Sequence, residues 1–338
     1  MTPYNFDKEI NRKGTNSVKY DLLKTYFGRE DVLSMWVADM DFETPDFVLE
    51  AIAQRLQHPV LGYSLRPKSF NKAVLEWMKT RHGWQVKPTE VSFSPGVVTG
   101  LFLAMKAFTK AGDKIVVQPP VYFPFFTTVK ANEREIVYNQ LHENQGHYTM
   151  DFKDLIAKLD NQTKMIFISN PHNPVGRAWK LKELEELVEI CHAYNILIVS
   201  DEIHSDLVFS PNKHIPIASI SAQAAKITLT LMAPSKTFNM AGLSTSMMII
   251  QNPKLMRAYN RQMEATHLNQ GNIFGTVGAE AAYNYGADWV DEMMTYLQGN
   301  IDFVMDFISR YSADSTTFMT KPNIPLFIFQ DCFYSILS

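Results

Sequence analysis

The sequence predicts an α/β fold in which a large domain holds a mostly parallel sheet sandwiched by helices, and a smaller α/β lobe draws on both chain ends. Short apolar, β-branched runs alternate with amphipathic helical stretches through the middle of the chain, which is typical of a parallel sheet covered on both faces. The 338 residues suit two lobes, and 46% apolar with 20% charged residues supports a sizeable core.

Helical apolar spacing and end signals predict the helices. Thr44 and Pro45 are typical of an N-cap followed by proline at the first helical position, and Gly83 is a typical residue just past a helix end. The predicted ranges are about 46–57, 69–82, 99–110 and 181–194. Beyond about Asn252 the pattern is mainly helical.

Five short runs are predicted to be strands of the sheet. They are Lys114–Val117, Glu135–Tyr138, Lys164–Ser169, Ile196–Ser200 and Lys226–Leu231. We expect an N-terminal arm and part of the small domain in residues 1–45, the large domain in 46–285 and the rest of the small domain in 286–338. Ligands of such sheets bind outside the carboxyl ends of the strands, so the residues that follow each strand are the candidates for a site.

Composition and missing motifs narrow the function. A net charge of −3, from 32 basic and 35 acidic residues, argues against nucleic acid and a charged membrane surface as partners. Two cysteines cannot build a disulfide framework, the start is polar, and no apolar run is long enough for a bilayer, so a cytoplasmic protein is expected. The P-loop, dinucleotide, esterase and zinc-protease motifs are also missing.

Polar, reactive residues follow three neighbouring predicted strands. One strand ends in DEIHSD (201–206), the one before it in NPHNPVGR (170–177), and the one after it in APSKTFNMAG (233–242). The first segment alone is compatible with a solvated strand end or, less readily, a metal site, although neighbouring side chains of an extended chain point to opposite faces. A lysine at 236 among apolar neighbours at this edge suits covalent chemistry with a carbonyl compound.

These segments resemble those of pyridoxal-phosphate (PLP) enzymes of the aminotransferase type, and more closely the cystathionine β-lyase branch known as the MalY/PatB C–S lyases. SNPHNPVGR, SDEIHSDL and PSKTFNMAGL carry the resemblance, and SMWVADMDF (34–42), GYS (62–64), FSPGVV (93–98) and PPVYFPF (119–125) support it in the family's order. The resemblance implies a homodimer with shared active sites and a small amino-acid substrate.

The resemblance assigns roles to individual residues. It implies that Lys236 bonds covalently to PLP and moves the substrate Cα proton, and that Asp201 pairs with the pyridine nitrogen. The other implied cofactor-binding residues are Gly96, Val97, Val98 and Ser235 at the phosphate, Tyr122 stacked on the ring, Asn173 and His204 at the 3-oxygen, and Tyr63 at the phosphate of the partner's cofactor. Trp36 and Asp39 are expected at the substrate entrance, and no metal is expected.

The sequence departs from the family pattern in two places. Ala233 stands where the family commonly has serine, which removes one phosphate hydroxyl. After Pro322 the chain continues as NIPLFIFQDCFYSILS, and no arginine follows Arg310. We therefore expect a C-terminally truncated small domain without the arginine that binds the substrate carboxylate. Three hypotheses follow: a carbon–sulfur β-lyase that releases thiol, pyruvate and ammonia, an aminotransferase, or a PLP-binding protein with impaired catalysis.

Overall fold

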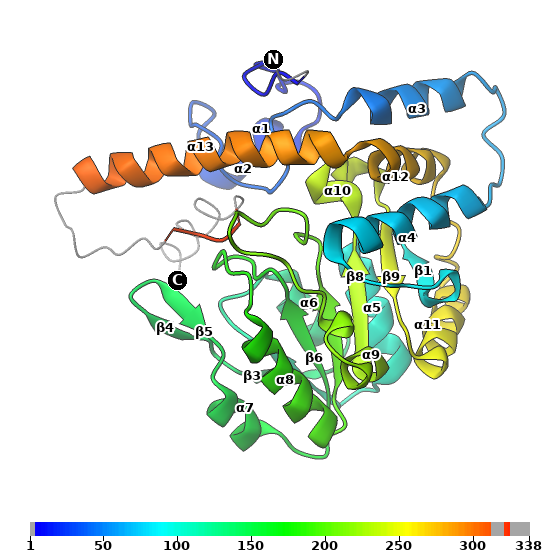
Figure 1. Cartoon of the computed structure of the whole chain (residues 1–338), viewed down its shortest axis with the longest axis vertical. Helices are drawn as coiled ribbons and strands as arrows, with labels where there is room; N and C mark the ends of the chain where they lie inside the picture. The colour runs from blue at the N-terminus through cyan, green and yellow to red at the C-terminus, as the bar shows by residue number, and fades with distance from the viewer. Residues whose placement is uncertain (1–3, 312–320, 325–338) are drawn as a thin grey trace.

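The computed structural model describes residues 4–311 and 321–324 and shows a seven-stranded sheet between layers of helices (Figure 1). The sheet order is β1-β9-β8-β7-β6-β2-β3. Its strands are β1 (Val91–Ser94), β2 (Lys114–Val117), β3 (Glu135–Tyr138), β6 (Thr163–Ser169), β7 (Leu197–Asp201), β8 (Thr228–Met232) and β9 (Ser246–Ile249). A separate hairpin is formed by β4 (His142–Asn144) and β5 (His147–Thr149).

All pairs of the sheet are parallel except the two made by β9, which runs against both β8 and β1. The strands β1, β8, β7, β6 and β2 therefore point the same way, and their carboxyl ends lie along one edge. Five predicted strands are confirmed with ends shifted by at most two residues. The fold class predicted from the sequence is confirmed as well.

Both faces of the sheet are buried, as the continuous apolar strands predict. One face packs on α5 (Val97–Phe108), α6 (Pro124–Lys130) and α11 (Pro253–Ala265). The other packs on α8 (Leu181–Ala193) and α9 (Ala222–Ile227) at β6 and β7, and on α4 (Lys68–His82) and α12 (Ile273–Tyr285) at β8 and β9. The other helices are α1 (Val18–Asp21), α2 (Leu23–Phe27), α3 (Asp46–Leu56), α7 (Phe152–Lys158), α10 (Pro234–Thr237) and α13 (Ala287–Tyr311).

Helix α3 begins at Asp46, as predicted, but its N-cap lies one residue later than predicted. Pro45, not Thr44, is the N-cap, because the Thr44 hydroxyl donates to the Asn239 carbonyl at 2.9 Å instead of capping the helix. Gly83 ends α4 with φ +64°, as its position predicts.

The N-terminal segment lies against α13 (Figure 1). Phe6 contacts Trp289 edge-on at 5.6 Å, and the Tyr296 hydroxyl donates to Asp7 at 2.7 Å. The predicted domain boundaries stay predictions, and most of the predicted incomplete C-terminal lobe after Pro322 lies outside the described residues. Within the described ranges, no helix has the length and apolarity needed to cross a bilayer.

Candidate active site

The carboxyl edge of the sheet gathers most of the residues that the sequence singles out. Asp201 ends β7 and pairs in register with Ser169 of β6 and Leu231 of β8. Gly96 follows β1, Tyr122 follows β2, Asn173 follows β6 and Lys236 follows β8. Because these strands run in the same direction, five chain segments far apart in sequence meet at one edge.

Lys236 is the half-buried amine of this edge. It lies on α10, and its Nζ donates to the carbonyl of Ala38 at 2.6 Å. Burial lowers the pKa of Lys236, although the charges of Asp39 and Asp201 oppose the shift. An amine with a depressed pKa is neutral more often at physiological pH, which suits a nucleophile and proton carrier.

Asp201 is a buried carboxyl group, with 5% of its surface exposed. Its Oδ1 accepts the backbone N–H of Ile203 at 3.1 Å. Burial raises the pKa of Asp201 to about 7; the Ile203 hydrogen bond and the charge of Lys236 act against this shift, and Glu202 adds to it. A bound cationic group would restore the ionised form of this carboxyl.

The loops after β2 and β6 are joined to each other beside this carboxyl. The Tyr122 N–H donates to the Asn173 carbonyl at 3.2 Å, and the Asn173 N–H donates to the Ser169 hydroxyl at 3.1 Å. Asn173 is buried and Tyr122 half-buried. His204 is buried as well, and burial with the nearby charge of Lys236 lowers its pKa to about 3, so its imidazole is neutral.

Gly96 forms an open cradle at the N-terminus of α5. It has φ +116°, a conformation that favours glycine, and a Cβ placed there would meet nothing within 4 Å. No side chain of the described residues caps this helix, so the first-turn N–H groups, including those of Val97 and Val98, have no capping partner. Such a helix start binds anions. Ser235, half-buried, lies at the same edge next to Lys236.

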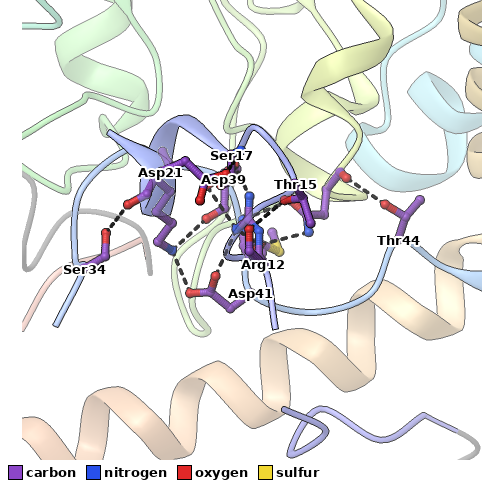
Figure 2. Close-up of polar contacts among 12 residues, drawn as sticks. Arg12, Thr15, Ser17, Asp21, Ser34, Asp39, Asp41 and Thr44 are labelled. Atoms are coloured by element: carbon purple, nitrogen blue, oxygen red, sulfur yellow. Dashed lines mark hydrogen bonds and ion pairs between the residues drawn. The ribbon is translucent and has the colours of Figure 1, made fainter. Parts of the chain in front are cut away.

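An ionic cluster near the N-terminus fixes the segment that covers Lys236. Figure 2 shows Arg12 beside Asp39 and Asp41, and its guanidinium donates to them at 2.6 and 2.9 Å. Lys19 adds bonds to the Asp41 carboxylate at 2.7 Å and to the Asp39 carbonyl at 3.1 Å. Ala38, the acceptor for Lys236, immediately precedes this cluster.

Asn239 ties the same segment to the loop that carries the lysine. Its side chain accepts the Met40 N–H at 3.0 Å and donates to the carbonyls of Met40 and Phe42 at 3.0 and 2.7 Å. Sequence reasoning missed Arg12, Lys19 and Asn239 as parts of the site. The only signal was the proximity of Asn239 to Lys236 in the chain, because their partners are distant in sequence.

Two of the predicted residues lie elsewhere in this chain. Trp36 packs against Tyr26 and Phe27, at ring distances of 4.6 and 5.2 Å, and its indole N–H donates to the Lys19 carbonyl at 3.3 Å. Tyr63 is 98% exposed on the connection between α3 and α4. The structure therefore brings neither side chain onto the sheet edge from within this chain.

The donor set at the sheet edge fits one kind of ligand. An anion cradle, a buried acid that needs a cationic partner and a half-buried amine lie along the same edge. In the described ranges, no group of three or more His, Cys, Asp or Glu side chains could hold a metal ion. The arrangement suits an anionic, nitrogen-containing ring that carries a group open to attack by an amine.

Comparison with known proteins agrees with this arrangement. The family model for aminotransferase class I and II matches residues 30–333. Cystathionine beta-lyase PatB of Bacillus subtilis is 44% identical over 328 residues, which cover 97% of this chain and 84% of the relative.

Two solved structures share the fold. Cystalysin of Treponema denticola, which contains pyridoxal 5′-phosphate, has a TM-score of 0.89 and 34% identity, covering 96% of this chain and 83% of that one. The PLP-bound C–S lyase of Staphylococcus hominis has a TM-score of 0.87 and 34% identity, with 96% and 81% covered. The chain belongs to the aminotransferase class I and II family. Several of its relatives carry names of the predicted cystathionine β-lyase branch, and aminotransferases are among its relatives as well.

Proposed function

We propose that the protein binds pyridoxal 5′-phosphate and is a carbon–sulfur β-lyase. Its substrates are cystathionine or cysteine S-conjugates, and its products are a thiol, pyruvate and ammonia. The observation that carries the proposal is that half-buried Lys236 and buried Asp201, each of which feels the charge of the other, lie at the sheet edge that also bears the Gly96 cradle. The names of the cystathionine and C–S lyase relatives support the same reaction.

Each of the residues at this sheet edge is proposed to bind a different part of the cofactor. The Gly96 cradle, with the first-turn N–H groups of Val97 and Val98 and the Ser235 hydroxyl, holds the phosphate. Asp201 would pair with the ring nitrogen and keep it protonated. Tyr122 would stack on the ring, a contact worth about 1 kcal/mol. Asn173 and His204 would hydrogen-bond to the ring oxygen.

Lys236 carries the proton transfers. The bound cofactor supplies an aldehyde that captures the substrate amine and a ring that accepts electron density from Cα. With the cofactor bound, Lys236 Nζ would remove the Cα proton of the substrate. The Asp201 carboxylate would stabilise the positive charge on the ring nitrogen, which favours loss of that proton and of the β-thiolate. Asp39, next to the acceptor of Lys236, lines the substrate entrance, and Trp36, packed on Tyr26 and Phe27, supports the segment that carries Asp39.

The decisive experiment is an absorbance spectrum of the purified protein with PLP, before and after addition of cystathionine, followed by a pyruvate assay. We expect a visible band that changes on addition of substrate, and pyruvate without any added keto acid. Lys236→Ala should lose both. A visible band of wild-type intensity in Lys236→Ala would refute the assignment of the lysine.

An aminotransferase is the second candidate, because the family model that matches this chain is named for that activity. Its reaction uses the same residues but returns the proton to the cofactor. Stoichiometric formation of pyridoxamine phosphate, with no pyruvate from cystathionine, would favour it. The prediction of impaired catalysis is tested by the same assay: cofactor uptake without turnover of any β-substituted amino acid would support it.

We further propose a homodimer with shared active sites, in which Tyr63 reaches the phosphate of the partner's cofactor. The exposed apolar residues of its segment, Val60, Leu61 and Leu65, support a surface that a second copy covers. Mixing Lys236→Ala with Tyr63→Ala subunits should restore about a quarter of wild-type activity, because half of the dimers then hold one intact site. No recovery after verified subunit exchange would contradict the sharing. A cytoplasmic location is also proposed, and cell fractionation tests it.

A further inference from the structure

The DEIHSD segment holds two carboxyl groups that the proposed function does not use. Glu202 and Asp206 lie on either side of His204 in sequence and are 0% and 6% exposed. Each meets a buried histidine: Glu202 lies 2.8 Å from His214, and Asp206 lies 3.0 Å from His82. Buried acids that bind neither ligand nor solvent are costly unless they are paired, so their partners indicate what they do.

Asp206 joins three separate elements. Its Oδ1 accepts the indole N–H of Trp77 at 3.0 Å and lies 3.0 Å from His82 Nε2, both on α4. Its Oδ2 accepts the Thr237 hydroxyl of α10 at 2.8 Å. Burial opposes ionisation of Asp206, but the contact with His82, aided by Thr237, outweighs it and lowers the pKa of Asp206. The loop after β7 is thus fastened to the turn that carries Lys236.

Glu202 is equally buried but is fastened elsewhere. It accepts the Ser200 hydroxyl at 2.8 Å and the Ile217 N–H at 3.1 Å, and His214 Nε2 lies 2.8 Å away. None of these groups belongs to α10. The chain therefore offers two neighbouring acid–histidine pairs of similar burial, of which one contacts the lysine turn and the other does not.

The lysine turn needs an external anchor. Helix α10 spans four residues, Pro234–Thr237, and a helix of this length has little stability of its own. Thr237 is fully buried, and its side chain and that of Lys236 leave adjacent positions of this turn. We propose that Asp206 is a positioning residue for Lys236, which it holds in place through Thr237. This inference rests on the proposed function, because it takes Lys236 as the residue that bonds to the cofactor.

The test follows covalent capture of pyridoxal phosphate by cofactor-free protein in a stopped-flow spectrometer. The dependence of the rate on cofactor concentration separates the affinity of first binding from the rate constant of bond formation. In Asp206→Asn and Thr237→Val, we expect the rate constant to fall about 100-fold, the size of effect that a misplaced group produces. The affinity of first binding should change far less than the rate constant, because the Gly96 cradle follows β1 and only Ser235 of the proposed phosphate-binding groups lies on α10.

Glu202→Gln is the matched control, since it neutralises the other buried acid. The rate constant of Glu202→Gln should stay within about 3-fold of wild type. The double variant Asp206→Asn/Thr237→Val should be no slower than the slower of the two single variants, because both substitutions disrupt the same Asp206–Thr237 contact. A wild-type rate in Thr237→Val, or equal slowing by Glu202→Gln and Asp206→Asn, would overturn the positioning role. If Asp206→Asn does not fold, Thr237→Val decides. If Lys236→Ala captures pyridoxal phosphate covalently with the same rate constant as wild type, the proposed function is refuted, and the positioning role with it.

Discussion

Replacing Asp201 with asparagine is expected to stabilise the cofactor-free protein while it removes activity. The pKa of this carboxyl is 3.8 in an unfolded chain and about 7 in the fold, where burial disfavours the ion. A raised folded-state pKa contributes stability that is present below pH 3.8 and is lost as the pH rises through about 7. At ~1.4 kcal/mol for each pH unit between the two values, the loss amounts to about 4 kcal/mol at pH 8. The neutral side chain of asparagine avoids this loss of stability.

Urea unfolding of the cofactor-free proteins at several pH values measures this difference. The Asp201→Asn variant should exceed wild type by up to about 4 kcal/mol at pH 8 and match it near pH 3. With cofactor present, wild type should be more stable than Asp201→Asn, because in the variant the ring nitrogen loses its charged partner and the cofactor binds more weakly. A variant that is no more stable than wild type at pH 8 without cofactor would refute the reasoning, since the buried ion would then carry no cost.

Three further predictions concern neighbouring positions. Gly96→Ala should weaken cofactor affinity about 10-fold or more in an absorbance titration, because φ there is +116°; Gly112→Ala, with φ +80° away from the sheet edge, should cost stability but not affinity. Tyr122→Ala should weaken affinity about 5-fold by loss of ring stacking, and an unchanged affinity would remove that role. Burial lowers the pKa of His172 from 6.5 to about 4, so stability should fall by about 3 kcal/mol as the pH drops between those values, and His172→Gln should flatten that part of the urea-unfolding profile.

The sheet was predictable where its strands are apolar runs that contain several β-branched or aromatic residues. Lys164–Ser169 and Lys114–Val117 are of this kind. Strand β9 was not predicted, because its sequence, Ser-Met-Met-Ile, has one β-branched residue and follows a loop without a strong turn signal. The hairpin of β4 and β5 is polar and mostly exposed, so it lacks the apolar pattern on which such predictions depend.

The residues of the candidate site were predictable from the sequence, but the contacts that hold them in place were not. Lys236, Asp201 and Asn173 each follow a strand, and strand direction alone brings them to one edge. The partners of Asp206 and Asn239 are far away in sequence, 129 residues for Trp77 and 199 for Met40. No periodicity or local motif relates such positions, because the contacts exist only after the helices and the N-terminal segment have packed.

The reversed strand β9 sets the dimensions of the binding surface. It separates β1 from β8, so the anion cradle and the lysine turn lie two strand spacings apart, about 10 Å. Because β9 ends at the opposite edge, it widens this gap without placing a loop of its own carboxyl end in it. The interval between the two anchoring points is therefore set by hydrogen-bonded backbone and not by side chains, and a ligand that contacts both points must bridge it.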